Sequence, residues 1–296
     1  MLTNSILTFI LLAAAGEGTA IERRGNAAFT SYTALGDSYA SGNGPTPLLK
    51  GPGDAACHRT QGSYPYQFNL KYRTRSSTFQ FLACTATNTT EITEQVFDRH
   101  FGHPDLVTLD AGGNDGNFIS NSLANCIAAE AVLNATAYEA LCNAWIVQAS
   151  ALEQTLKPNI SALIKKAQTH NLLRHQKRKV VVTGYAQPFN ISGLPSDCPT
   201  TIPIPPLGPG NLADRVNLSV LALNAVIEAA AYENGALYAD IDAAFDGHRV
   251  CDAGEDFFQT DSSAPNAALA HPTADGYLAV AEAVARALGL VGELAS

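Results

Sequence analysis

The stretch YTALGDSYASG at residues 32–42 indicates both the fold and the place where its chemistry would lie. An apolar, β-prone run ends abruptly in Gly36-Asp37-Ser38, and small residues and a glycine follow it. This pattern predicts one hydroxyl at the carboxyl end of a strand, which is the edge where open α/β sheets bind ligands. Gly-Asp-Ser alone is also an ordinary turn. A serine at that edge becomes a nucleophile only if a base removes its proton and N–H groups receive the oxyanion.

Four further strand-like segments follow the one at 32–35, and helix-like segments separate them. Strands are predicted at residues 77–82, 105–109, 180–183 and 236–241. Helices are predicted at 64–71 and 90–101, in two or three pieces between 117 and 170 with breaks near Asn134 and at Pro158, from 212 to a stop at Gly235, and after Thr273 as an N-cap. Five strands alternating with helices predict a parallel sheet in a three-layer α/β/α sandwich.

Three later stretches supply groups that a serine nucleophile needs. Small residues at 83–87 (ACTAT) follow the second predicted strand, where backbone N–H groups can stay accessible. At 110–115 (DAGGND), two glycines after the third strand allow a sharp turn and hold one amide side chain at the sheet edge. His271-Pro272-Thr273 precedes the last helix. These segments favour a site over a plain turn at Ser38.

Composition restricts the classes of partner. The 296 residues are 46% hydrophobic and 15% charged, with a formal net charge of −9. A nucleic-acid surface needs a concentrated basic face, so we expect no nucleic-acid partner. The same charge disfavours anionic membranes.

The first residues have the features of a secretory signal. Within 1–20, an apolar run at 6–15 precedes Gly18-Thr19-Ala20, and the run is too short to span a bilayer. Arg23-Arg24 resembles a dibasic processing site, which makes 21–24 a short propeptide. We therefore expect a secreted, extracellular protein without a stable membrane anchor, whose residues 25–296 form a single domain.

Cysteines and glycosylation sequons agree with export. Six cysteines allow 15 pairings, of which we favour neighbours in sequence: Cys57–Cys84, Cys126–Cys142 and Cys198–Cys251. Asn-x-Ser/Thr sequons occur at Asn88, Asn134, Asn159, Asn190 and Asn217. Together with the signal, they favour a eukaryotic secreted protein such as a fungal one.

Taken together, the four stretches resemble the sequence blocks of the SGNH (GDSL) hydrolases, most of all the secreted lipase and esterase branch typified by the Streptomyces scabies esterase. The resemblance spans residues 32–288 in the family's order. It implies a flavodoxin-like three-layer α/β/α fold that needs no metal and no organic cofactor.

The resemblance also assigns roles to individual residues. Ser38 would be the nucleophile, His271 the base, and the Ser38 N–H and Asn114 two oxyanion donors. Ala86 stands where the family usually has a glycine whose N–H is the third donor. A second departure is Ala268, at a position where most members have an aspartate. In the scabies-like branch a backbone carbonyl at this offset orients the imidazole, a role that falls to Ala268 here, with Asp261 as an alternative.

These assignments predict a serine ester hydrolase that works through an acyl-enzyme. The loops show no strongly amphipathic lid, so we expect short acyl or acetyl esters, small or linked to a polymer such as a plant polysaccharide. A lipase or phospholipase acting on longer chains is one alternative. A catalytically weak binding protein that keeps the fold is another, favoured by Ala86 and Ala268. We expect a monomer.

Overall fold

A computed structural model describes residues 29–118, 153–190, 212–260, 268 and 270–291, together with helical residues 137, 140, 141, 143 and 144. The predicted signal and propeptide, residues 1–24, lie outside this part of the chain. The strands are β1 (Ser31–Leu35), β2 (Thr78–Phe81), β3 (Leu106–Asp110), β4 (Lys179–Thr183) and β5 (Leu237–Ala239). The helices are α1 (Ser38–Ser41), α2 (Tyr64–Tyr72), α3 (Thr89–Phe97), α6 (Glu153–Thr169), α7 (Leu212–Glu233) and α8 (Ala274–Ala287), with short 3₁₀ turns η1 (Asp115–Asn117) and η3 (Asp242–Phe245).

The five strands form one parallel sheet in the order β2-β1-β3-β4-β5. In its central pair, Ala34 of β1 lies opposite Thr108 of β3. The chain extends outward from β1 in one direction to β2 and in the other to β3, so β1 and β3 flank the point where the strand order reverses. In doubly wound sheets, ligands bind at this point, outside the carboxyl ends of the strands.

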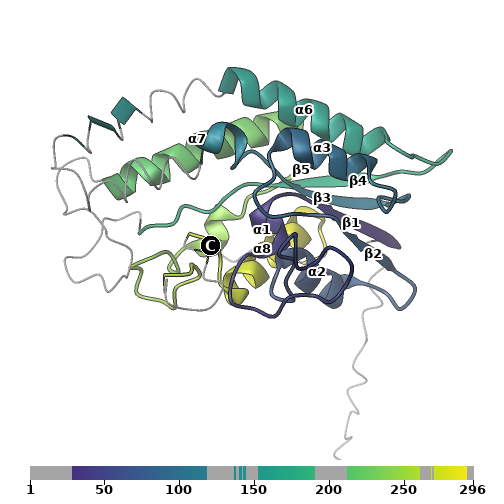
Figure 1. Ribbon diagram of the computed structural model, residues 1–296, viewed down its shortest axis with the longest axis horizontal. Coiled ribbons are helices and arrows are strands. Elements are labelled where there is room, and N and C mark those ends of the chain that lie inside the picture. The colour runs from purple at the N-terminus through teal and green to yellow at the C-terminus, as the bar shows by residue number, and fades with distance from the viewer. Residues whose placement is uncertain are drawn as a thin grey trace, which may run out of the picture.

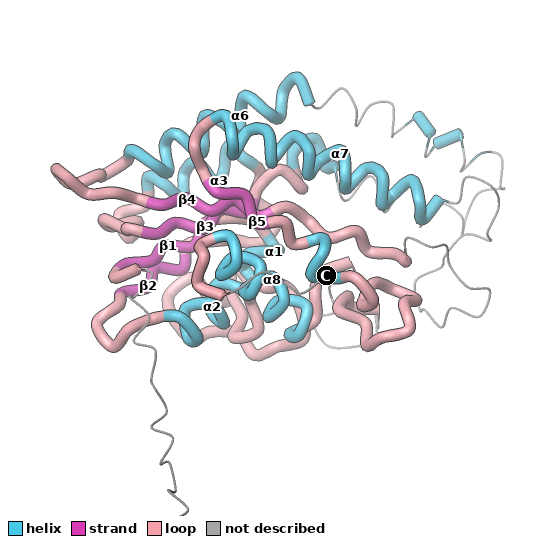
Figure 2. Tube along the Cα trace, turned by 180° about the vertical axis from the view of Figure 1, so that it is seen from behind, coloured by secondary structure: helices cyan, strands magenta, loops and turns pink. Residues whose placement is uncertain are grey.

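Helices cover both faces of the sheet. Helices α3, α6 and α7 lie on one side, and α2 and α8 lie on the other (Figures 1 and 2). Every residue of β3 is buried, and β4 is buried after its first residue. Continuous apolar strands are typical of a parallel sheet with both faces covered. The predicted three-layer α/β/α fold with five parallel strands is confirmed.

Two helix predictions need correction. Helix α3 ends at Phe97 and not at residue 101, because the Asp98 side chain accepts the His100 backbone N–H (2.7 Å) and closes a turn there. Pro158 does not interrupt the chain but lies inside α6. It lies on an exposed face, where water can satisfy the carbonyl that loses its helical N–H partner. The predicted break near Asn134 lies outside the described residues.

The predicted disulfide between Cys57 and Cys84 is present. Cys251 is also disulfide-bonded; its predicted partner Cys198, like Cys126 and Cys142, lies outside the described residues. No cysteine in the described part of the chain is free. In the same part, no helix combines the length and hydrophobicity that a membrane crossing requires.

The sequons lie in different environments. Asn159 is exposed on α6, and Asn88 is the N-cap of α3 in a capping box with Glu91. Asn190 donates to the Cys251 carbonyl oxygen (3.1 Å), and Asn134 lies outside the described residues. Asn217 is 3% exposed, and its amide bonds both the N–H and the carbonyl of Phe189. Its amide is thus buried with both atoms engaged in the folded chain, and glycosylation at the five sequons stays a prediction.

Candidate active site

Ser38 lies in a tight turn immediately after β1. Gly36 has φ 140°, and a Cβ there would lie 2.8 Å from the carbonyl oxygen of Asp110, so this turn requires glycine. Asp37 is the N-cap of α1 and accepts the Tyr39 N–H at 2.9 Å. Ser38 is therefore the first residue of α1, at the carboxyl end of a central strand and half-buried.

His271 approaches Ser38 from the loop that precedes α8. Its Nε2 lies 2.8 Å from Ser38 Oγ, across 233 positions of sequence. The Tyr39 hydroxyl donates to the Ala270 carbonyl oxygen at 2.7 Å, and the Tyr39 and His271 rings are 5.2 Å apart. The predicted nucleophile and base are thus brought within hydrogen-bonding distance. This is the geometry of a serine whose proton a base can remove.

Gln259, which is not among the predicted site residues, holds the histidine loop in place. Its side chain is buried and donates to the carbonyl oxygens of Asn43 (2.7 Å) and Pro272 (2.8 Å). It also accepts the Ala268 N–H at 3.0 Å. One amide thereby joins the loop after Ser38 to both sides of His271. No residue pattern indicates this role, because all the partners are backbone groups, which every residue type offers.

Ala268 lies three positions before His271, and its role as the partner of the imidazole stays a prediction. Its carbonyl oxygen accepts the His271 backbone N–H at 3.0 Å. Asp261, the alternative partner for the imidazole, lies outside the described residues.

The loop after β2 carries Ala86 and is fixed at several points. The Cys57–Cys84 disulfide anchors its start, and Arg59 Nε donates to the Ala83 carbonyl oxygen at 2.8 Å. Ala86 is exposed and has φ 61°. This left-handed backbone is the conformation that favours glycine, the residue usual at this position in the resembled family. The alanine therefore adopts the angle despite its Cβ.

Asn114 lies at the carboxyl end of β3 and contacts the Ala86 loop. Its Nδ2 donates to the Thr87 carbonyl oxygen at 3.0 Å, and an amide nitrogen carries a second N–H. The next residue, Asp115, accepts both the hydroxyl (2.6 Å) and the N–H (3.0 Å) of Thr89. The segment at 110–115 is thus hydrogen-bonded to the segment at 83–87.

Gln95, also absent from the predicted site residues, joins the serine turn to the Ala86 loop. Its side chain accepts the Gly36 N–H (2.9 Å) and donates to the Gly36 carbonyl oxygen (3.0 Å). The Thr87 hydroxyl bonds the same carbonyl oxygen at 3.1 Å. A signal was available here, because Gln95 is a polar residue on the buried face of α3, next to Val96.

Two carboxyl groups lie buried beneath the serine turn. Asp37 accepts the Tyr185 hydroxyl at 2.7 Å, and Asp110, the last residue of β3, accepts the Thr183 hydroxyl at 2.9 Å. Burial raises the pKa of Asp37 above its usual value and raises the pKa of Asp110 further. The Tyr185 hydroxyl also accepts the Gly113 N–H at 2.9 Å, which connects the serine turn to the residue before Asn114.

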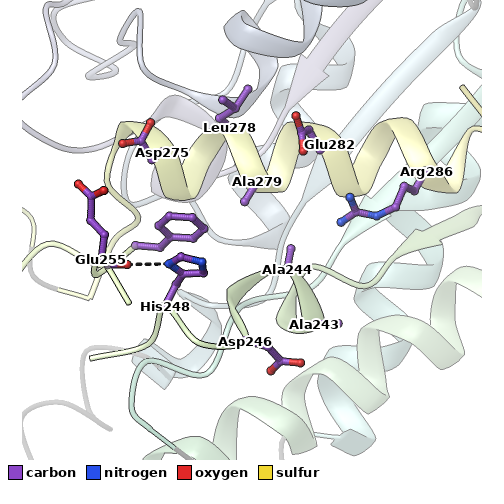
Figure 3. A pocket seen from close by; sticks show the side chains of 11 residues that line it. Ala243, Ala244, Asp246, His248, Glu255, Asp275, Leu278, Ala279, Glu282 and Arg286 are labelled. Carbon is purple, nitrogen blue, oxygen red and sulfur yellow. Dashed lines mark hydrogen bonds between the residues drawn. The ribbon is translucent and has the colours of Figure 1, made fainter. Parts of the chain in front are cut away.

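A pocket of about 570 Å³ lies elsewhere, between α8 and the segment that follows η3. In Figure 3, His248 bonds the Glu255 carbonyl oxygen (2.8 Å) and stacks on Phe257, and Asp275, Glu282 and Arg286 project from α8. Neither Ser38, Asn114 nor His271 lines it. His248 thus orders the loop that contains Glu255 and Phe257.

Comparison with known proteins gives matches that include Ser38, Asn114 and His271. A sequence model described as the GDSL-like lipase/acylhydrolase family matches residues 34–279. The lipase of Streptomyces rimosus is 27% identical over 252 residues, which cover 83% of this chain and 82% of the relative. The solved extracellular lipase of S. rimosus is 26% identical, with a TM-score of 0.66 and coverage of 85% of this chain and 97% of its own. Phospholipase A1 from Streptomyces albidoflavus NA297 is 28% identical, with a TM-score of 0.67 and coverage of 85% and 98%.

Proposed function

Since the chain belongs to the GDSL-like lipase/acylhydrolase family and is a carboxylic ester hydrolase, we propose that it cleaves esters through an acyl-enzyme on Ser38. The observation that carries this proposal is the 2.8 Å contact between Ser38 Oγ and His271 Nε2. A serine and an imidazole at this distance supply a nucleophile and its general base.

In the proposed reaction, Ser38 Oγ attacks the ester carbonyl while His271 Nε2 takes the hydroxyl proton. The backbone N–H groups of Ser38 and Ala86 and the Asn114 amide receive the oxyanion. His271 then gives its proton to the leaving alcohol, which leaves an acyl group on Ser38. A water molecule, deprotonated by His271, hydrolyses this acyl-enzyme and restores the free serine.

The proposed partner of His271 is the Ala268 carbonyl. Support comes from its position, since it already bonds the His271 backbone N–H. A carbonyl can hold the imidazole in one tautomer, but it stabilises an imidazolium less than a full negative charge does. An Ala268→Asp variant therefore tests whether a carboxylate at this place raises kcat, as the majority pattern of the family implies.

The acyl chain that the enzyme prefers is a separate part of the proposal. The sequence favours short acyl or acetyl esters, because no strongly amphipathic lid is evident. Similarity to Streptomyces proteins named lipase and phospholipase A1 favours longer acyl chains as the second candidate. The irregular segment at 187–210, in which we expect a wall of the substrate cleft, lies mostly outside the described residues.

We also propose that the enzyme is secreted and acts as a monomer on small or polymer-linked esters. The S. rimosus relative is described as extracellular, which agrees with a cleavable signal at residues 1–20. The mass of the secreted protein, measured intact after deglycosylation, tests whether the signal and propeptide are removed. A chain that starts at Gly25 is expected, and a retained residue 1 contradicts it.

Hydrolysis of p-nitrophenyl acetate, butyrate and palmitate by the wild type and by Ser38→Ala tests the reaction. We expect kcat of the variant to fall by about 10⁴-fold or more, because removing the nucleophile leaves only the oxyanion donors and substrate binding. The rate profile across the three esters separates the short-chain from the long-chain candidate. Equal rates in both proteins would instead support the binding-protein alternative.

A further inference from the structure

Asp37 and Asp110 bring two carboxyl groups together inside the protein. Asp37 precedes the proposed nucleophile and Asp110 ends β3, so the reversal of strand order between β1 and β3 places them side by side. Each residue is 1% exposed. A Cβ on Gly36, the residue before Asp37, would lie 2.9 Å from the Asp110 Cβ, so the two acids come from backbone positions that touch. Two carboxylates buried next to each other repel strongly, because no water screens their charges.

The hydrogen-bond partners of the two carboxyls are unequal. Both oxygens of Asp37 accept a proton donor: Oδ1 accepts the Tyr39 N–H and Oδ2 the Tyr185 hydroxyl. In Asp110, Oδ2 accepts the Thr183 hydroxyl, but Oδ1 is buried without a donor in the described structure. An oxygen that carries a proton needs an acceptor and no donor. The arrangement therefore fits an ionised Asp37 and a neutral Asp110 whose Oδ1–H points to it.

We propose that Asp37 and Asp110 share one proton at neutral pH, and that this pair, through Tyr185, positions the Gly113-Asn114 turn against Ser38. The inference about positioning rests on the proposed function of Ser38 and Asn114. The shared proton does not, because it follows from the buried contacts alone.

Tyr185 is the link between the pair and the oxyanion side of the site. Its hydroxyl has one proton, which goes to Asp37, and it accepts the Gly113 N–H. An ionised Asp37 is acceptor-only, which suits its two bonds from the Tyr39 N–H and the Tyr185 hydroxyl. The proton on Asp110 keeps Asp37 an acceptor and removes the repulsion between the two acids. These residues are positioning groups, since none contacts Ser38 Oγ or His271 in the described hydrogen bonds.

The groups that surround the pair supply no positive charge. In the described structure, the titratable neighbours that interact with either acid are four tyrosines and one carboxylate: Tyr39, Tyr64, Tyr185, Tyr277 and Asp115. Burial raises the pKa of each of these tyrosines, so they stay neutral. Asp115 can only disfavour a second negative charge. Nothing in this shell favours ionisation of both acids.

The sign of the pH dependence follows from these groups. Burial and the Asp37 charge raise the pKa of Asp110 well above its usual value. The folded chain then keeps a proton that the unfolded chain releases above about pH 4. The stabilisation is therefore complete below that pH and is lost as the pH rises toward the raised pKa of Asp110. Over this window, one extra bound proton makes the unfolding equilibrium constant rise about tenfold per pH unit.

Asp110→Asn tests the shared proton. The amide oxygen can accept the Thr183 hydroxyl and the amide N–H can donate to Asp37, so the variant reproduces the neutral acid without a titratable proton. We would measure urea unfolding between pH 5 and 8 in a Ser38→Ala background, which separates the result from turnover. In Ser38→Ala alone, the proton on Asp110 should make the unfolding equilibrium constant rise about tenfold per pH unit. The double variant lacks this proton, so its unfolding constant should rise less steeply by that factor. A second readout is the infrared carbonyl band of a buried, protonated carboxylic acid, which should disappear in the double variant.

Parallel unfolding slopes in the two proteins, with no such infrared band, would overturn the shared proton. If the double variant does not fold, the band in Ser38→Ala still decides the question: its presence at neutral pH supports the pair and its absence refutes it. A Ser38→Ala protein that keeps full esterase activity would refute the proposed function and leave the slope test valid.

Asp37→Asn tests the positioning role in the otherwise wild-type enzyme. The amide of this variant has one acceptor oxygen for the two donors that the carboxylate accepts, so either the Tyr185 hydroxyl or the Tyr39 N–H loses its acceptor and the serine turn shifts. We expect kcat to fall by roughly 10- to 100-fold with KM changed by less than about threefold, because a displaced oxyanion donor affects mainly the transition state. Asp110→Asn should retain more of kcat than Asp110→Ala, since only the amide restores the donor to Asp37. An unchanged kcat in Asp37→Asn, or equal kcat in the two Asp110 variants, would overturn the positioning role.

Discussion

Asn114 is the clearest single residue on which to test the oxyanion site. One amide N–H already bonds the Thr87 carbonyl oxygen (3.0 Å), which holds the side chain beside the Ala86 loop. Asn114→Ala removes the other N–H, and we expect kcat to fall about 10²- to 10³-fold with little change in KM. Steady-state kinetics with p-nitrophenyl butyrate measure both values. A twofold effect on kcat would remove Asn114 from the oxyanion site.

Ala86 provides a second test at the residue scale. Its φ of 61° costs a residue with a Cβ about 1 kcal/mol, which glycine would avoid. Glycine also increases the conformational entropy of the unfolded chain, which lowers the free energy of unfolding by about 0.4–1 kcal/mol. We therefore expect Ala86→Gly to change the free energy of unfolding by less than about 1 kcal/mol and to keep turnover, because the N–H remains.

Ala86→Val is the matched control for this position. A β-branched residue is strained at positive φ, so this variant should lose both stability in urea unfolding and kcat. Equal behaviour of the glycine and valine variants would mean that the backbone angle at residue 86 does not matter for the site.

At the level of elements, the loop after β2 depends on the Cys57–Cys84 disulfide, whose cysteines are 27 positions apart. Replacing both by serine should lower the free energy of unfolding by about 3–4 kcal/mol in the chain-entropy model. It should also lower kcat, because the disulfide fixes the start of the loop that carries Ala86. Urea unfolding and ester hydrolysis at a temperature below unfolding measure the two effects separately. A loss of less than about 1 kcal/mol with unchanged kcat would contradict this role.

Most elements could be predicted from the sequence, because local pattern decides them. Strands β3 and β4 are short apolar runs, and Thr273 caps α8 by accepting the Gly276 N–H, as predicted. The misplaced end of α3 and the intact helix around Pro158 have a common cause. In both cases a hydrogen-bonding detail, the Asp98 side chain or a solvated carbonyl, overrode the residue pattern.

The residues that support the site could not be predicted in the same way. Gln259 bonds backbone groups of Asn43, Ala268 and Pro272, and any residue type offers such groups. Asp37 and Asp110 meet only because β1 pairs with β3. Ser38, Asn114 and His271 could be singled out because each lies at the end of a recognisable element, while their roles came from the family resemblance and stay predictions.

For the whole molecule, the strand order explains why distant blocks form one site. Parallel strands present their carboxyl ends at one edge, so the turns after β1, β2 and β3 converge there. The loop before α8 then brings His271 to the same edge, held by Gln259 and by the bond from Tyr39 to Ala270. The fold thus supplies the positions, and the side chains at the strand ends supply the chemistry.

The central claim is that His271 activates Ser38, and covalent labelling with a serine-directed alkyl phosphonate tests it most directly. We would follow the rate of labelling in the wild type, Ser38→Ala and His271→Ala, and locate the label by peptide mass spectrometry. We predict one label per chain on the peptide that contains Ser38, none in Ser38→Ala, and a rate lower by several orders of magnitude in His271→Ala. A label on another residue, or an undiminished rate without His271, would contradict the claim.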